Sequence, residues 1–304
     1  MKLICPNKSL FSDRVLKIVK KKFETKIADL SQNEFDKIYK KYEIILLRFK
    51  TFLKYNKKHN IKYILSPTTG TNHIDSNFFK DKRVKIFTLQ DEKNFMKTIH
   101  ASSEFTVLLI LFTLRKLVFL NLKKQSNHKQ FIGSEINNKT VGIIGFGRIG
   151  RKVVKILNAF GAKIFVHEIK KKNRKNSKLK FVSLIQLLKK SDIISIHIPS
   201  NDQNKNFLNN TNLKYLKKGA LIINTSRGEV VNELHISKFV KKKDIRYTSD
   251  VISNENKINK NYLMRFKKNS DCILTPHIAG LTNESIEKTD LYIFNKFLKY
   301  YEGK

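Results

Sequence analysis

Three side chains that can act together on a carbonyl compound each follow an apolar run of the sequence: Arg227, Glu255 and His277. A guanidinium can bind a substrate carboxylate and polarise a carbonyl oxygen. An imidazole can donate a proton to a developing alkoxide, or remove one from an alcohol. A carboxylate on the far nitrogen of that imidazole would orient the ring and favour its protonated form. These residue types therefore predict hydride chemistry on a small 2-keto or 2-hydroxy acid.

The apolar runs before these residues are predicted to be parallel strands at Ala220–Asn224, Arg246–Asp250 and Cys272–Leu274. Open α/β sheets bind their ligands beyond the carboxyl ends of the strands, which is where all three side chains would lie. Taken singly, a surface Arg, a solvated Glu and a core His would each be ordinary. Their shared position at strand ends favours a common site.

A glycine-rich loop precedes these strands in the sequence. The run Thr140–Ile144 leads into Gly145, Gly147 and Gly150, spaced as G-x-G-x-x-G, and a helix is expected at Arg151–Phe160. The first glycine permits a tight turn, the second a close approach of a pyrophosphate, and the third close packing of helix on strand. Amide groups at the helix N-terminus would stabilise the phosphate charge.

Glu168 follows a predicted strand at Lys163–Val166, eighteen residues after Gly150. A carboxylate there can accept hydrogen bonds from ribose hydroxyls and would repel a 2′-phosphate, so NAD is favoured over NADP. The alternative is a strand-ending Glu without a ligand. Basic residues follow at once and would offset the repulsion: Lys170, Lys171, Lys172 and Arg174.

The strands and helices alternate along the chain, which predicts the α/β class with two domains. Residues 104–282 are expected to form a doubly wound parallel Rossmann sheet with six strands, the three named above, Thr140–Ile144, Lys163–Val166 and Asp192–His197. Residues 1–103, completed by residues 283–304, are expected to form a smaller α/β domain. Its predicted strands are Lys2–Cys5, Lys26–Ala28, Glu43–Arg48 and Lys62–Leu65, with helices at Asp13–Lys22 and Ser285–Tyr300.

The composition is strongly basic, with a formal net charge of +37 over 304 residues. Such a charge suggests nucleic acid or an anionic surface, but the lysines are spread along the whole chain. Abundant Lys, Asn, Ile and Phe are typical of an A/T-rich genome, so we expect no specific nucleic-acid partner. The field would still attract a small carboxylate substrate and a pyrophosphate.

Two cysteines, Cys5 and Cys272, have no metal-ligand spacing and form no disulfide framework, so no metal site is expected. The most apolar run, Phe105–Leu114, is shorter than the about 20 residues of a membrane span and is predicted to be a buried helix within residues 103–122. No signal peptide is recognised at the start. The sequence thus predicts a cytoplasmic protein without a membrane partner.

With these motifs together, the sequence resembles the D-isomer specific 2-hydroxyacid dehydrogenases. The resemblance extends over nearly the whole chain. It rests on Ser66-Pro67-Thr68-Thr69-Gly70-Thr71-Asn72-His73-Ile74-Asp75, Ala101-Ser102-Ser103-Glu104-Phe105-Thr106, the glycine loop, Asn224-Thr225-Ser226-Arg227-Gly228 and Thr275-Pro276-His277-Ile278-Ala279-Gly280. It implies a flavodoxin-like substrate domain, a Rossmann cofactor domain, NAD as cofactor and a homodimer joined through the cofactor domains.

The resemblance also implies a role for individual residues. Arg227, Glu255 and His277 become the catalytic residues, and the amides around Thr69 and Gly70 hold the substrate carboxylate together with Arg227. The remaining cofactor contacts are expected from Arg148, Ile149, Pro199, Thr225, Asp250 and Gly280. For Asp250, a cap at the end of its strand is the alternative.

The sequence departs from the family pattern at two positions. Asn256 stands where a Pro usually follows the catalytic Glu, in a polar stretch from Asn254 to Asn261, and Phe105 replaces a frequent His. Among substrates, 3-phosphoglycerate is favoured for a short form of the phosphoglycerate dehydrogenase branch, while glyoxylate, hydroxypyruvate and lactate stay open. Two rival functions are an NAD-sensing, corepressor-like protein without turnover and a Rossmann enzyme of other chemistry.

Overall fold

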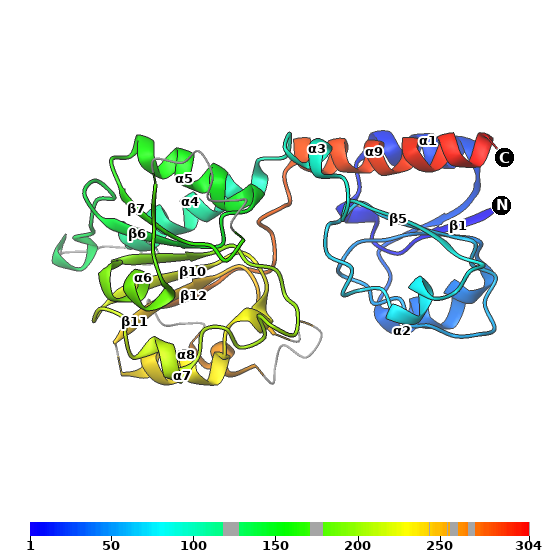
Figure 1. The fold of residues 1–304 in the computed structure, drawn as a ribbon. Coiled ribbons are helices and arrows are strands. Elements are labelled where there is room, and N and C mark those ends of the chain that lie inside the picture. Colours follow the sequence, from blue (N-terminus) through cyan, green and yellow to red (C-terminus); the bar gives the residue numbers. More distant parts are fainter. Residues whose placement is uncertain are drawn as a thin grey trace. The chain divides into compact units, whose positions relative to one another are not determined.

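The computed structural model describes residues 1–117, 128–170, 179–242, 244–253, 255, 261–266 and 271–303. The chain divides into two compact units (Figure 1), residues 1–99 with 281–304 and residues 100–280. The sequence predicts a division after residues 103 and 282. Each unit is built on one parallel sheet with helices on both faces.

The first unit contains a five-stranded sheet in the order β2-β1-β3-β4-β5, in which every pairing is parallel. This strand order is that of flavodoxin-like folds, as predicted. The strands are β1 (Lys2–Cys5), β2 (Glu24–Ile27), β3 (Ile44–Leu46), β4 (Tyr63–Ser66) and β5 (Lys85–Thr88). The helices are α1 (Asp13–Lys22), α2 (Gln32–Ile38), α3 (Lys93–Met96) and α9 (Asn283–Glu302).

Alternating side chains of these strands fill two cores, one on each face of the sheet. Leu3 and Cys5 belong to the core beneath α1 and α9, while Ile4 belongs to the opposite core beneath α2. The C-terminal helix α9 lies beside α1 (Figure 1), so the last residues of the chain complete the unit formed by the first. Phe294 and Phe297 of this helix are fully buried in that core.

The second unit contains a seven-stranded parallel sheet in the order β12-β11-β10-β9-β6-β7-β8. Numbered along the chain this is the doubly wound order 3-2-1-4-5-6 with a seventh strand added, which confirms the predicted Rossmann sheet. The strands are β6 (Thr140–Ile144), β7 (Lys163–His167), β8 (Lys180–Phe181), β9 (Ile193–Ile196), β10 (Ala220–Asn224), β11 (Ile245–Ser249) and β12 (Cys272–Leu274). The helices are α4 (Ala101–Leu114), α5 (Arg148–Ala159), α6 (Leu184–Lys190), α7 (Asn210–Leu213) and α8 (Glu233–Lys241).

Helices cover both faces of this sheet (Figure 1). One core lies beneath α4 and α5, and the other lies beneath α6, α7 and α8. The strand order reverses between β6 and β9, so the loop after β6 opens at a topological switch point, where such sheets bind their ligands.

The apolar helix α4 is packed into the second unit. The helical run Lys93–Leu114 is long and apolar enough to cross a membrane by length and composition alone, and 44% of its most apolar stretch is buried. Within it α4 contacts α5 and β10, and Val107, Leu109 and Ile110 are buried in the core of the unit. The predicted helix to residue 122 is too long: α4 ends at Leu114, and Lys116 has φ of +54°, which a helix does not allow. Residues 118–127 lie outside the described part.

Two strands were absent from the sequence prediction, β5 and β8. The two-residue β8 is too short to carry an alternating pattern, and β5 has only one fully buried side chain, Phe87. The helix after the glycine loop begins at Arg148, three residues before its predicted start at Arg151. The sequence pattern missed this turn because its side chains are not apolar in the helical period.

Candidate active site

Three neighbouring strands, β10, β11 and β12, bring the predicted catalytic residues to one edge of the second unit. The strands are parallel and adjacent, so their carboxyl ends lie together. Arg227 follows β10, Glu255 follows β11 and His277 follows β12. The structure therefore places all three at the edge where this type of sheet binds its ligands.

His277 and Glu255 are paired. The Nδ1 atom of His277 lies 2.9 Å from Oε2 of Glu255, and their side chains are 27% and 37% exposed. An ionised carboxylate can only accept, so Nδ1 is the donor and Nε2 is the nitrogen that can exchange a proton with a ligand. The pair has the geometry of an acid-base group with an orienting partner.

The backbone of His277 is held in an unusual conformation, with φ of +55°, which non-glycine residues seldom adopt. Asp250 holds the segment: its carboxylate accepts from Ile278 N at 2.9 Å, Ala279 N at 2.8 Å and the Thr275 hydroxyl. The amide of His277 also donates to Asp250 O at 2.9 Å. These contacts are those expected of Asp250 as a structural cap, and its contact with the cofactor stays a prediction.

Arg227 lies in a segment braced by the buried side chain of Asn224. Asn224 Nδ2 donates to Arg227 O at 2.9 Å, and its Oδ1 accepts from the amide and hydroxyl of Ser226. Burial lowers the pKa of the Arg227 guanidinium, while the nearby charges of Glu229 and Glu255 oppose that effect. A partly desolvated cation beside the imidazole pair suits the binding of a carboxylate.

The glycine loop has the local geometry that phosphate binding requires. Gly145 has φ of +92°, and a Cβ there would lie 2.6 Å from His197 O, so only glycine fits. A Cβ on Gly150 would lie 2.3 Å from Gly145 O, whereas one on Gly147 would meet open space. Gly147 caps α5, so the amides of the first turn of this twelve-residue helix, those of Arg148 and Ile149 among them, lie at its N-terminus, where helices bind phosphate.

Glu168 is buried against this loop, with 7% of its surface exposed. Its Oε2 accepts from Phe146 N at 2.9 Å, and its Oε1 accepts from Lys170 N at 2.7 Å. Each carboxylate oxygen has further lone pairs, so a ribose hydroxyl can still be accepted. Of the basic residues expected to offset its charge, Lys171, Lys172 and Arg174 lie outside the described residues, as does Asn256.

The remaining predicted contacts lie in both units. The Thr225 hydroxyl is 2.7 Å from that of Thr106 on α4, and Pro199 O accepts from Asn204 Nδ2 at 2.9 Å. Gly280 is exposed at the end of the second unit. Thr69 and Gly70 belong to the first unit, in a loop where the Thr68 hydroxyl donates to Gly70 O at 2.8 Å. Their part in a common site stays a prediction.

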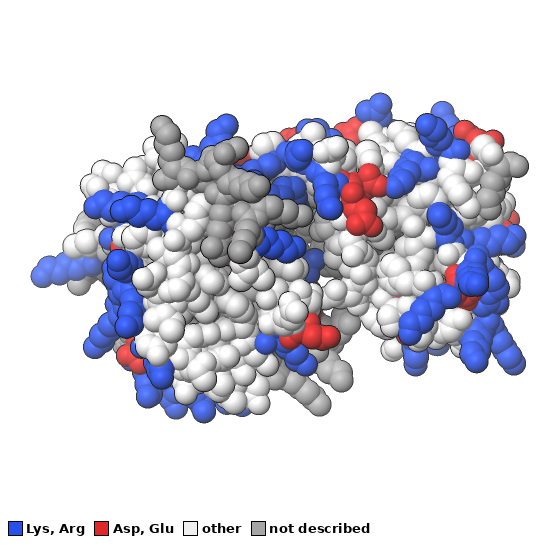
Figure 2. Space-filling model, in the orientation of Figure 1, with Lys and Arg blue, Asp and Glu red and all other residues white. Residues whose placement is uncertain are grey.

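Basic side chains are distributed over the visible surfaces of both units, with acidic ones between them (Figure 2). Among the described residues no group of three or more His, Cys, Asp or Glu could hold a metal ion.

Sequence reasoning assigned no role to three residues that brace the backbone near the candidate catalytic residues, Asn224, Glu233 and Asn261. All three are polar and less than a tenth exposed. The available signal was a polar residue at a position that the pattern assigns to the core, as Asn224 is at the end of an otherwise apolar strand.

Comparison with known proteins agrees with this geometry. Residues 107–279 match the family model of the D-isomer specific 2-hydroxyacid dehydrogenase NAD binding domain. The chain is 31% identical to the glyoxylate reductase of Aeropyrum pernix over 216 residues, which cover 67% of this chain and 64% of that protein. It is 30% identical to the D-3-phosphoglycerate dehydrogenase of Haemophilus influenzae over 236 residues, 76% of this chain and 56% of that protein. The chain thus spans less than two thirds of these two relatives.

A solved structure supports the fold over the full length. The apo form of D-lactate dehydrogenase from Escherichia coli aligns with a TM-score of 0.84, covering 100% of this chain and 98% of that one at 22% identity. The likeness concerns the fold, and it extends over both units of this chain.

Proposed function

Because the chain belongs to the D-isomer specific 2-hydroxyacid dehydrogenase family, we propose that it transfers a hydride between NAD(H) and a small 2-hydroxy or 2-keto acid. The observation that carries this proposal is the His277–Glu255 pair, 2.9 Å apart, at the strand edge that also bears Arg227. The substrate class follows from what these groups can bind and protonate.

The residues of the glycine loop fit the dinucleotide. The open space at Gly147 and the first amides of α5 would receive the pyrophosphate, and Glu168 would accept hydrogen bonds from the ribose. Nicotinamide, when bound, supplies the site that accepts or donates the hydride. The carboxylate of Glu168 favours NAD over NADP.

In the direction of reduction, Arg227 binds the substrate carboxylate and polarises the keto oxygen. His277, protonated at Nε2, gives that proton to the oxygen as it becomes an alkoxide. Glu255 stabilises the imidazolium and fixes the plane of the ring. In the direction of oxidation, neutral His277 removes the hydroxyl proton through the same nitrogen.

The identity of the acid is a finer proposal. The names of the two relatives differ in substrate, glyoxylate in one and 3-phosphoglycerate in the other. We favour 3-phosphoglycerate, as the sequence pattern around Thr69 and Gly70 suggests, with glyoxylate as its competitor. A few side chains decide between them, because a pocket discriminates one methylene by only about 1–3 kcal/mol.

The test is NADH oxidation with a panel of glyoxylate, hydroxypyruvate, pyruvate, 2-ketoglutarate and 3-phosphohydroxypyruvate, with NADPH in parallel. Turnover with a preference for NADH supports the proposal and begins to name the acid. Tight NADH binding without turnover would favour an NAD-sensing protein, whose DNA binding should then show a sequence preference together with a steep salt dependence.

We also propose a homodimer that acts in the cytoplasm. The two cysteines are buried thiols without a disulfide, which is compatible with a reducing compartment. Light scattering of the purified chain tests the dimer, and fractionation of the source cells tests the compartment. A monomer by light scattering at micromolar concentration would contradict the first part.

A further inference from the structure

Glu255 lies in a polar stretch of the sequence. From Ser253 to Asn261 the only apolar residue type is Ile258, and there is no proline. Such residue types give the backbone few intrinsic restraints. The contacts that flank Glu255 are therefore of interest for its position against His277.

We propose that Glu233 and Asn261 are positioning residues for Glu255, because together they hold both flanks of the segment that carries it. Glu233, the first residue of α8, accepts from Ser253 N at 2.6 Å through Oε1 and from Asn261 Nδ2 at 2.5 Å through Oε2. Asn261 Nδ2 also donates to Ser253 O at 3.2 Å. The role of Glu255 itself rests on the proposed function.

This pair is buried and is tied to rigid parts of the unit. Glu233 is 8% exposed and Asn261 is 9% exposed, and Leu263 N, beside a fully buried Leu263 side chain, donates to Asn261 Oδ1 at 2.9 Å. Burial raises the pKa of Glu233, and the hydrogen bonds from Ser253 and Asn261 oppose that effect. A carboxylate buried in this way costs stability unless its hydrogen bonds are satisfied, so its presence favours a positional role.

The same backbone supports the segment of Arg227. A Cβ on Gly228 would lie 2.0 Å from the carbonyl carbon of Ile252 and 2.1 Å from Ser253 N. The backbone at Gly228 therefore touches the backbone at Ile252–Ser253 at a point where only glycine fits. The amide of Ser253 thus lies between Gly228 and the Glu233 carboxylate. A shift of Ser253 would move Glu255 relative to both His277 and Arg227.

The decisive variant is Glu233→Gln, which keeps the shape and can still accept from Ser253 N. The amide nitrogen of the substituted side chain would lie opposite Asn261 Nδ2. Both groups are donors, so the hydrogen bond between positions 233 and 261 is lost. Combining Glu233→Gln with Asn261→Asp reverses donor and acceptor and restores that bond, while the donation from Asn261 Nδ2 to Ser253 O is lost. Val240→Ala is the matched control, because Val240 is buried on the same helix and its apolar side chain cannot form a hydrogen bond to Ser253 or Asn261.

The readout is the titration midpoint of the His277 imidazole, followed by NMR with selectively labelled histidine and assigned with a His277→Asn variant. We expect Glu255→Gln to lower the midpoint, because the imidazolium loses its charged partner. Glu233→Gln should lower it by a smaller amount, the pair with Asn261→Asp should recover part of that loss, and Val240→Ala should leave it unchanged. In the Glu255→Gln background, Glu233→Gln should add nothing.

A midpoint for Glu233→Gln equal to that of the wild type would overturn the proposal, and so would an equal shift in Val240→Ala. This measurement needs no substrate, so it is separate from the test of the proposed function. If the panel also yields turnover, the acidic limb of the kcat/KM profile should move with the NMR midpoint. A chain that shows the coupling but no turnover would retain the positioning role and lose the dehydrogenase assignment.

Discussion

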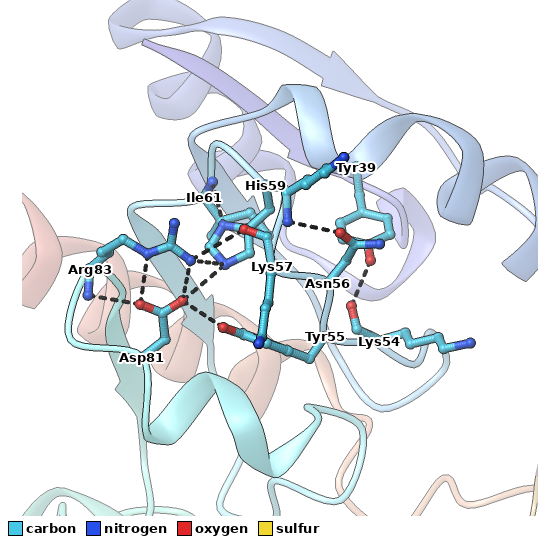
Figure 3. A network of polar contacts seen from close by, with 10 residues as sticks. Tyr39, Lys54, Tyr55, Asn56, Lys57, His59, Ile61, Asp81 and Arg83 are labelled. Atoms are coloured by element: carbon cyan, nitrogen blue, oxygen red, sulfur yellow. Dashed lines mark hydrogen bonds and ion pairs between the residues drawn. The ribbon is translucent and has the colours of Figure 1, made fainter.

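Two networks in this molecule use the same kinds of side chain but differ in what they leave accessible. In the first unit, Asp81 accepts from Tyr55, Arg83 and His59 (Figure 3), and the side chains of His59 and Asp81 are 1% and 7% exposed. In the second unit, the His277 and Glu255 side chains are 27% and 37% exposed. The residue types alone therefore do not identify a site.

The tautomer of His59 explains why its network is structural. Ile61 N donates to His59 Nδ1 at 3.1 Å, so Nε2 carries the proton and faces Asp81 at 3.3 Å. Both ring nitrogens are occupied within the unit, between the loop before β4 and the turn before β5 (Figure 3). His277, in contrast, uses Nδ1 for its carboxylate and has Nε2 on the side away from it. The comparison predicts that activity follows the second network and stability the first.

The largest difference is expected between two arginines. Arg227→Ala should reduce turnover by about a hundredfold to a thousandfold, because the group that binds the substrate carboxylate and polarises the carbonyl is lost. NADH affinity should change little. Arg83→Ala should leave turnover near the wild-type value while lowering the melting temperature, since Arg83 is paired with Asp81. Loss of NADH binding in Arg227→Ala would instead assign that residue to the cofactor.

A smaller effect is expected at Glu168, which shares a feature of the first network, a carboxylate that accepts from backbone amides. Glu168→Gln should reduce the preference for NADH over NADPH by about tenfold, because a charge that repels the 2′-phosphate is removed. Asp192→Asn is the matched control. Asp192 also accepts from a backbone amide, Thr140 N at 2.8 Å, but it lies at the amino-terminal ends of strands β6 and β9 of the same sheet. An unchanged cofactor preference in Glu168→Gln would make Glu168 a brace of the glycine loop only.

The sequence predicted the fold and the three catalytic candidates because both depend on local patterns. The sequence itself contains the apolar runs that lead to Gly145, Arg227 and His277. Because these runs alternate with helices, the strands that they form are expected to be parallel. The networks around them join residues such as Glu233 with Ser253 and Asp250 with Ala279, which are twenty or more positions apart. Register and burial decide those contacts, and neither can be obtained from one sequence.

The next effect concerns the pH profile. Glu255→Gln should move the acidic limb of the profile in the oxidation direction downward, because the imidazolium loses its charged partner. Glu229→Gln is the control, since it removes a charge that acts on Arg227 but is not paired with His277. An acidic limb that stays in place would remove Glu255 from the proton relay. One that moved equally in both variants would indicate a general effect of charge.

The smallest expected effect is a change in how steeply the free energy of unfolding depends on pH. This measurement distinguishes the imidazole of His59 from that of His277. Burial, with the nearby charge of Arg83, lowers the pKa of His59 below its ordinary value of 6.5, so the folded state keeps the ring neutral. The unfolded chain binds a proton as pH falls through 6.5, so the free energy of unfolding should decrease below that pH. His59→Gln removes the titrating ring but keeps an amide that can donate to Asp81, and it should flatten this slope, as measured by urea unfolding at pH 7, 6 and 5. His277→Gln is the comparison variant, because His277 belongs to the other network and lies in the second unit. If the slope changed with His277 and not with His59, the assignment of a structural network to the first unit and an accessible one to the second would be reversed.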